Sequence, residues 1–377
     1  MKALVLTISL FGLGHLKRTS LLLEKLSDRF EIDWLVSGFS DNLLPPAPNV
    51  RIVHFPKAPL FEAYAYQADP KLYRRTLNAS IVEWVRFFED FCKEEYAFFL
   101  TESFPISKTA LDVQMGAMLS LFKKRNPRGR VYASSKGMPF AGREELTYEA
   151  RLGNAELIQY SCELMKRYYD LVFLHADPKI YKLDEEGPLF PEVKRDILRY
   201  TGYVARIPTA PPKREKRILF SGGSGLGLGK LYGAGLEAAA LMPDFQFRFL
   251  RGPYAPEINS SLKNVEFTNF VDDFQGLLLT SAAAVTQGGS TLVDLYATKT
   301  PALAHPSKES WDQKKFTEKF SRAGAVKILS DEDLEGNKLA ERLMRLLVDP
   351  PSFETEIDIG GQEKTYRLIL DDLERHG

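Results

Sequence analysis

The chain contains the stretch Val285-Thr-Gln-Gly-Gly-Ser-Thr-Leu-Val-Asp294, which predicts a strand, a glycine turn and a helix in succession. The Ser-Thr pair after the two glycines is typical of a helix N-cap and first turn. Unpaired amides at such a helix start attract a phosphate, and the Asp294 carboxylate, about one turn further, can accept hydrogen bonds from a ribose diol. An ordinary strand–loop–helix connection is the alternative, because short glycine motifs are weak evidence.

The alternation of strand and helix extends along the whole chain. In the first half, apolar runs predict strands at 3–9, 30–36, 50–55, 96–100, 130–134 and 171–175, with helices at 17–26, 72–95, 108–125 and 148–168. In the second half we expect strands at 218–221, 245–250, 265–270, up to 286, and 301–304, with helices at 230–241, 290–298, 311–322, 331–348 and 361–375. This order indicates βαβ units and parallel sheets, and therefore an α/β protein.

A proline-rich, basic segment at 206–216 divides the chain of 377 residues and predicts a linker. We expect an N-terminal Rossmann-like domain over 1–205 and a C-terminal Rossmann-like domain over 217–355. A last segment, 356–377, is expected to form a helix that crosses back to the first domain. Two such domains facing across a cleft would bind a ligand between the carboxyl edges of their sheets.

The composition indicates a globular protein, with 44% apolar and 27% charged residues. Fifty basic residues balance fifty acidic ones, which gives no argument for a nucleic-acid partner. Cys92 and Cys162 have neither metal-site nor disulfide-framework spacing, so we expect no metal and a reducing compartment. No apolar run approaches the roughly 20 residues of a membrane span, and the N-terminal run lacks a cleavage pattern, so we expect a cytoplasmic protein.

A second glycine turn, Gly12-Leu-Gly14, follows the first predicted strand and leads into His15 and Arg18. A histidine at a helix start is disfavoured in its protonated form by the helix dipole, which suits a neutral general base. Glu102, at the end of the fourth predicted strand, is expected to orient His15 or an acceptor. A structural histidine and a capping or surface carboxylate are the alternatives.

Two further features occur at predicted strand ends. Residues 221–229 contain a G-G-x-G-x-G pattern, but the next strand ends at the basic Arg251 and shows no clear acidic residue at its end, which argues against a dinucleotide site. This loop is either close to a diphosphate or a flexible surface loop. Asp312 and Gln313, at a helix start, offer acceptors and donors for sugar hydroxyls, with N-capping as the alternative for Asp312.

In this order and spacing, the motifs resemble the GT-B glycosyltransferases, particularly the MurG-like group and its uncharacterised branch of predicted glycosyltransferases. The resemblance spans nearly the whole chain and is strongest over 265–325. It also includes Tyr169–Pro178, Tyr200–Val204, Val271–Asp273 and Arg322–Gly324.

The resemblance implies an inverting, metal-independent transfer of a hexose-type sugar from a nucleotide diphosphate sugar, a UDP-sugar by preference, to a hydroxyl acceptor, with no cofactor. His15 would be the base, with Glu102 beside it. The donor would meet Gly14, Arg18, Ser224, Gly225, Arg251, Phe270, Gly288, Gly289, Ser290, Thr291, Asp294, Asp312 and Gln313. Within this set, 288–291 and the 224–225 pair would contact the diphosphate, Asp294 the ribose, Asp312 and Gln313 the sugar, and Arg251 or Phe270 the nucleobase.

Two departures leave the acceptor open. The first turn is Gly-x-Gly-His, shorter than in the lipid-intermediate transferases, and the ribose position holds Asp294 where those enzymes have Glu. The acceptor is therefore a small molecule, a glycan or a lipid, and a lipid would imply peripheral membrane contact. The shorter turn also resembles that of nucleotide-sugar hydrolases, so a hydrolase or epimerase on the same fold is the alternative. A non-catalytic nucleotide-sugar-binding protein is the third hypothesis.

Overall fold

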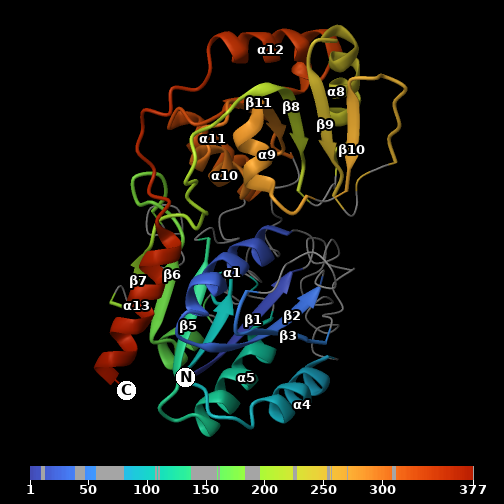
Figure 1. Ribbon diagram of the computed structural model, residues 1–377. Helices are drawn as coiled ribbons and strands as arrows, with labels where there is room; N and C mark the ends of the chain where they lie inside the picture. The colour runs from blue at the N-terminus through green and yellow to red at the C-terminus, as the bar shows by residue number, and fades with distance from the viewer. Residues whose placement is uncertain are drawn as a thin grey trace. The chain divides into compact units, whose positions relative to one another are not determined.

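The chain forms two compact units in the computed structural model (Figure 1). The first comprises Met1–Leu10, His15–Val204 and Gly360–Gly377, and the second comprises Phe11–Gly14 and Ala205–Ile359. The structure describes residues 1–9, 13–38, 47–56, 80–106, 108, 111–136, 159, 162–182, 196–223, 227–252, 255, 257–269, 271–307 and 311–376.

The first unit contains a seven-stranded sheet in the order β3-β2-β1-β4-β5-β6-β7, in which every neighbouring pair is parallel. Its strands are β1 (Lys2–Ser9), β2 (Glu31–Gly38), β3 (Val50–His54), β4 (Phe98–Glu102), β5 (Arg130–Ser135), β6 (Leu171–Leu174) and β7 (Leu198–Tyr200). The central strands β1 and β4 are almost wholly buried, as expected when helices cover both faces of a parallel sheet.

The helices of the first unit include α1 (Leu13–Leu26), α4 (Ile81–Phe91), α5 (Asp112–Arg125) and the C-terminal α13 (Gly361–His376). Helices α4 and α5 pack against each other. The start of α13 lies beside α1, because Gln362 Nε2 donates to the carbonyl of Leu21 and Lys25 Nζ lies 3.7 Å from Glu363.

The end of α13 is fastened to β5 by the buried Asp372 carboxylate. Arg130 donates to its two oxygens at 2.7 and 2.9 Å, and the Tyr132 hydroxyl donates at 2.7 Å. Burial raises the pKa of Asp372, but hydrogen bonds from Arg130 and Tyr132 bring it below its ordinary value. The last helix of the chain is therefore part of the first unit, where it is bonded to strand β5 of the sheet.

The second unit contains a six-stranded parallel sheet in the order β10-β9-β8-β11-β12-β13. Its strands are β8 (Glu215–Ser221), β9 (Gln246–Leu250), β10 (Val265–Thr268), β11 (Ser281–Thr286), β12 (Ala302–Ala304) and β13 (Lys327–Ile328). Its helices are α8 (Gly229–Leu241), α9 (Phe274–Thr280), α10 (Thr291–Ala297), α11 (Trp311–Arg322), the 3-10 turn η2 (Asp331–Asp333) and α12 (Gly336–Val348).

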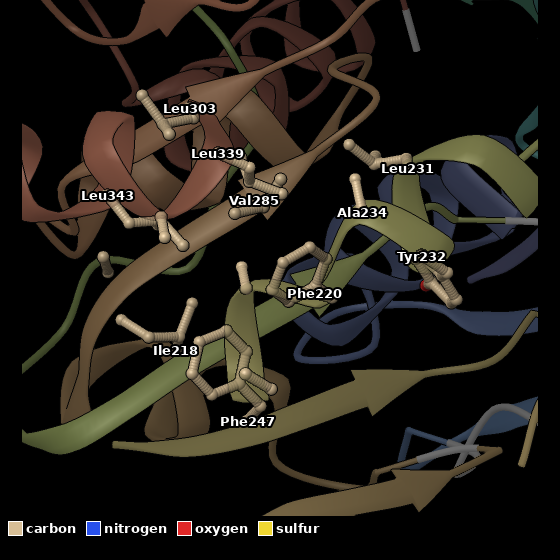
Figure 2. Close-up of a cluster of buried hydrophobic side chains, with 14 of the residues drawn as sticks. Ile218, Phe220, Leu231, Tyr232, Ala234, Phe247, Val285, Leu303, Leu339 and Leu343 are labelled. Atoms are coloured by element: carbon tan, nitrogen blue, oxygen red, sulfur yellow. The ribbon is translucent and has the colours of Figure 1, made fainter. Parts of the chain in front are cut away.

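The core of the second unit lies between its sheet and the helices α8 and α12, which pack against each other (Figures 1 and 2). Phe220 of β8 stacks on Phe249 of β9 with ring centroids 4.6 Å apart. Leu339, Leu343 and Leu346 of α12 are fully buried, and their spacing of four and three residues places them on one helix face.

The predicted fold class is confirmed as far as the two parallel, Rossmann-like α/β sheets are concerned; the facing of the two domains across a cleft stays a prediction.

Several elements differ from expectation. Residues 274–280, expected as the approach to a strand, form α9, because the Asp273 side chain caps the helix by accepting from the Gly276 amide at 2.8 Å. The short strands β7 and β13 were not predicted. Of the long helix predicted at 72–95, α4 ends at Phe91, and residues 72–79 lie outside the described part.

We predict that Asp372→Asn lowers the free energy of unfolding by about 2–3 kcal/mol, because Arg130 and the Tyr132 hydroxyl lose their ionised acceptor on α13. Arg130 keeps its second carboxylate partner, Asp170, at 2.9 Å. The measurement is urea unfolding followed by circular dichroism. The matched control is Asp371→Asn, which removes the same charge from an exposed neighbour on the same helix and should change stability by less than about 0.5 kcal/mol. Equal effects of the two substitutions would contradict the assignment.

Candidate active site

In each sheet the strand order reverses at one point, and several of the sequence-predicted residues follow the strands that meet there. In the first sheet, β1 lies between β2 and β4, so His15 in α1, which follows β1, and Glu102 at the end of β4 meet at neighbouring carboxyl ends. In the second sheet, β8 lies between β9 and β11. Gly222 and Gly223 follow β8, and the turn 287–290 follows β11. Open α/β sheets bind their ligands at these switch points.

The centre of the first candidate site is the Glu102 carboxylate, whose side chain is 1% exposed. His15 Nδ1 lies 2.7 Å from Glu102 Oε1, and the Ser103 hydroxyl donates to the same oxygen at 2.5 Å. Arg18 Nη2 also contacts Oε1, while Lys108 Nζ lies 2.7 Å from the other oxygen, Oε2. One carboxylate thus holds an imidazole, a hydroxyl, a guanidinium and an ammonium.

This geometry assigns the proton of the neutral His15 ring to Nδ1. An ionised carboxylate only accepts hydrogen bonds, so Nδ1 must donate to Glu102. Nε2 then carries the lone pair and is the atom able to take a proton from a substrate. The His15 side chain keeps 27% of its surface exposed, whereas Glu102 is inaccessible.

Burial and the nearby cations keep the imidazole neutral. Burial, followed by the charges of Lys108 and Arg18, lowers the pKa of His15 to about 4, although Glu102 acts in the opposite direction. Burial alone would raise the pKa of Glu102, but His15, Lys108 and Arg18 together hold it well below its ordinary value. At neutral pH the pair is therefore a neutral imidazole beside an ionised carboxylate.

The second candidate site is the turn between β11 and α10. Gly288 and Gly289 have φ angles of +95° and +69°, in the left-handed region that favours glycine. The Gly288 amide donates to the Thr286 hydroxyl at 3.2 Å, Ser290 is the N-cap residue of α10, and Thr291 is its first residue. Asp294 lies in the first turn of α10 and is 6% exposed.

Helix α11 lies against this turn. A Cβ on Gly289 would be 3.9 Å from Gln313 Nε2, and the Thr317 hydroxyl donates to the Gln313 carbonyl at 2.7 Å. Gln313 Oε1 is buried and has no hydrogen-bond partner among the residues that the structure describes. Gln313 is therefore brought to the predicted donor turn with an acceptor atom still to be satisfied.

Arg251 follows β9 directly. Its amide donates to the Thr268 carbonyl at 2.8 Å, and its guanidinium carbon lies 4.5 Å from the centre of the Phe267 ring. Gly14 and Arg18 belong to α1, and Arg18 contacts Glu102. The side chain of Asp312 in α11, and all of Ser224, Gly225 and Phe270, lie outside the described residues.

Sequence reasoning missed Ser103 and Lys108. Both have positive φ angles, +69° and +60°, and this conformation aims their side chains at Glu102. The sequence signal that could have identified Ser103 and Lys108 was their position shortly after the predicted strand that ends at Glu102. His175, also at a strand end, is buried between the Ser134 and Thr201 hydroxyls at 2.8 Å each, which is a structural role.

Among the residues that the structure describes, no group of three or more His, Cys, Asp or Glu side chains is arranged to hold a metal ion. None of the described helices has the length and apolar character that crossing a membrane requires.

Solved structures of other proteins share this fold. Solved structures of similar fold include the glycotransferase of kitacinnamycin (TM-score 0.62, 14% identity, covering 100% of this chain and 95% of that one). MurG from Acinetobacter baumannii matches with a TM-score of 0.56 and 14% identity over 98% of this chain and 100% of its own. A protein assigned as a UDP-N-acetylglucosamine 2-epimerase from Listeria monocytogenes matches with a TM-score of 0.59 and 13% identity over 100% and 96%. The chain therefore has the fold of the GT-B glycosyltransferases, as the sequence resemblance implied.

Part of the second half of the chain also resembles a known family in sequence. Residues 239–369 match the model of the Glycosyltransferase family 28 C-terminal domain. An uncharacterized glycosyltransferase from Methanosarcina acetivorans is 25% identical over 218 residues, which cover 54% of this chain and 56% of that protein. The match thus spans about half the length of this curated relative.

We predict that the two turn glycines differ in their tolerance of a methyl group. Gly289→Ala should cost about 1–2 kcal/mol of stability for its left-handed backbone alone, since its nearest neighbour is 3.9 Å away. Gly288→Ala should cost about 1–3 kcal/mol more, because its Cβ would lie 2.4 Å from the hydroxyl of the fully buried Thr317. Denaturant unfolding of both variants checks the order, and an equal or reversed cost would contradict the described turn.

Proposed function

We propose that this protein is an inverting glycosyltransferase that moves a hexose-type sugar from a nucleotide diphosphate sugar, UDP-linked by preference, to a hydroxyl acceptor. The observation that carries the proposal is the match of residues 239–369 to a glycosyltransferase domain, because this range contains the turn at Gly288–Gly289 together with Asp294 and Gln313. The pair of His15 and Glu102 at the switch point of the other sheet supplies a group suited to activating an acceptor.

The proposed reaction is a single displacement. The acceptor oxygen forms a bond to the anomeric carbon, the bond from that carbon to the phosphate oxygen breaks, and the nucleoside diphosphate leaves with the electron pair. The acceptor proton passes to His15 Nε2. Glu102 stabilises the imidazolium that forms, because its carboxylate already accepts from Nδ1 at 2.7 Å.

On the donor side, the proposed roles follow the geometry of the second unit. The backbone amides of 289–291 meet the diphosphate. Negative charge develops on the diphosphate as it leaves, and these N–H donors stabilise that charge. Gln313, with its unsatisfied Oε1 beside this turn, accepts from a sugar hydroxyl, as does Asp312. Asp294 meets the ribose and Arg251 the nucleobase. We propose that no metal ion or cofactor takes part.

A second candidate function has its own support. The structural likeness to the protein assigned as a 2-epimerase supports another activity on a nucleotide sugar as the alternative, because one fold can carry several functions. A hydrolase would use water in place of the acceptor. A protein that only binds nucleotide sugars is the third candidate.

The first experiment is a calorimetric screen of nucleoside diphosphates, followed by the sugar-linked forms of the nucleotide that binds. The proposal expects one nucleoside diphosphate to bind with a clear base preference, UDP first. Gly289→Ala should weaken binding of the nucleoside diphosphate, whereas Gln313→Ala should weaken only binding of its sugar-linked form. The absence of binding by every nucleoside diphosphate at millimolar concentration would sink the proposal.

We predict that His15→Ala lowers turnover of the nucleotide sugar by about 10²- to 10⁴-fold, the range for loss of a general base, and leaves its affinity nearly unchanged. The control is His305→Ala, which removes a histidine that contacts Asp331 in the second unit. Sugar released without acceptor as fast as donor is consumed would favour hydrolysis. A changed sugar still attached to its nucleotide would favour epimerisation, and binding without any turnover would favour the non-catalytic hypothesis.

A further inference from the structure

The cation at position 108 is an unused feature of the first candidate site. The Lys108 side chain is 9% exposed, and its ammonium contacts Glu102 Oε2 at 2.7 Å and the carbonyl oxygen of Ile8 at the end of β1. Burying an ammonium costs free energy unless it is paired and hydrogen-bonded. Lys108 is thus a costly residue to bury at this position, where His15, Arg18 and Ser103 already contact the same carboxylate.

The backbone at this point is held in an uncommon conformation. Lys108 has φ +60° and Ser103 has φ +69°, although neither residue is glycine. Such conformations cost of order 1–3 kcal/mol each and tend to occur at functional sites. Both residues direct a donor to Glu102, one to each carboxylate oxygen.

We propose that Lys108 is a positioning residue, which fixes the Glu102 carboxylate beside His15 and, by its charge, sets the protonation state in which the imidazole meets its substrate. This inference deepens the proposed function and rests on it for the catalytic meaning of that state.

The argument has a geometric part. A carboxylate turns about the bond to its own chain unless both oxygens are held. His15, Ser103 and Arg18 contact Oε1, and Lys108 contacts Oε2 from the other side. Lys108 is itself anchored by Ile8, so the orientation of Glu102 is tied to the end of β1, the strand that leads to the segment carrying His15.

The argument also has an electrostatic part. A lone ionised Glu102 would stabilise imidazolium and raise the pKa of His15. Lys108 partly cancels this charge, and it acts together with burial and Arg18 to lower that pKa. The described charged groups around the cluster are Arg18 from α1, Glu102 from β4, Lys108, and Lys136 after β5. Burial, and to a smaller extent the charges of Arg18 and Lys136, lower the pKa of Lys108. The other titratable group near the cluster that the structure describes is His175, after β6, which is neutral because burial lowers its pKa.

The test is an NMR titration of the full-length protein labelled at the histidine Cε1 carbons, with the His15 signal assigned by its loss in His15→Gln. In Lys108→Met we expect the titration midpoint of His15 to rise by about one pH unit, a tenfold change in the protonation equilibrium. Lys108→Arg, which keeps the charge, should leave the midpoint near that of the natural protein. If turnover is found, the acidic limb of its pH profile should move upward by the same amount in Lys108→Met.

The control is Lys123→Met. Lys123 makes similar contacts in the same unit, donating to the Gly129 carbonyl at 2.8 Å and to Asp170 at 3.3 Å, but it is not part of the cluster. It should lower stability without moving the His15 midpoint. If Lys108→Met does not fold, Lys108→Gln keeps a donor for the Ile8 carbonyl and removes the charge.

An unchanged His15 midpoint in a folded, uncharged Lys108 variant would overturn the inference, as would an equal shift in Lys108→Arg. Because the titration needs no substrate, a protein that consumes no nucleotide sugar would refute the proposed function and leave the measured shift intact. Conversely, turnover lost in His15→Ala with an unmoved midpoint in Lys108→Met would support the function and reject the role of Lys108.

Discussion

The hydrogen bond between His15 Nδ1 and the buried Glu102 carboxylate is the interaction on which the first candidate site depends. A carboxylate that is 1% exposed is stable only when charged donors surround it, and Arg18 and Lys108 supply them. Glu102 raises the pKa of His15, but burial, together with the charges of Lys108 and Arg18, lowers that pKa to about 4. His15 is thus neutral, is oriented by the hydrogen bond from Nδ1, and can accept a proton at Nε2.

The position of this pair follows from sheet topology. Parallel strands place all their carboxyl ends at one edge, and the order of the first sheet makes β1 and β4 neighbours at its switch point. The second sheet repeats the arrangement with β8 and β11, which bring Gly227 and Gln287 close together, with 3.6 Å between a Cβ on Gly227 and Gln287 Nε2. Each unit thus presents loop residues, which are free to vary in chemistry, at the edge where a rigid sheet positions them best.

Much of the fold could be predicted from the sequence, because buried parallel strands are continuous apolar runs and the connecting helices carry leucines at helical spacing. The turn at Gly288 and Gly289 was predictable for the same kind of reason, since only glycine adopts their backbone angles without strain. Helix α9 was not predictable with confidence from its Leu277–Leu279 run, because an apolar run just before a strand has no clear period of its own.

The cluster around Glu102 shows where sequence reasoning ends. His15 and Glu102 could be proposed from their places at strand ends, but Ser103 and Lys108 join them only through left-handed backbone that neither residue type prefers. The number of cations on one carboxylate also depends on tertiary contacts over as many as 84 positions, as between Arg18 and Glu102. The acidity of the histidine is therefore a property of the folded unit and cannot be deduced from a motif.

The most direct test of the central claim is the tautomer of His15, read from the ¹⁵N chemical shifts of its two ring nitrogens at pH 7. The account predicts a neutral ring with the proton on Nδ1 and a bare Nε2. A charged ring, or a neutral ring with its proton on Nε2, would contradict it, because neither form could take a proton from an acceptor while donating to Glu102.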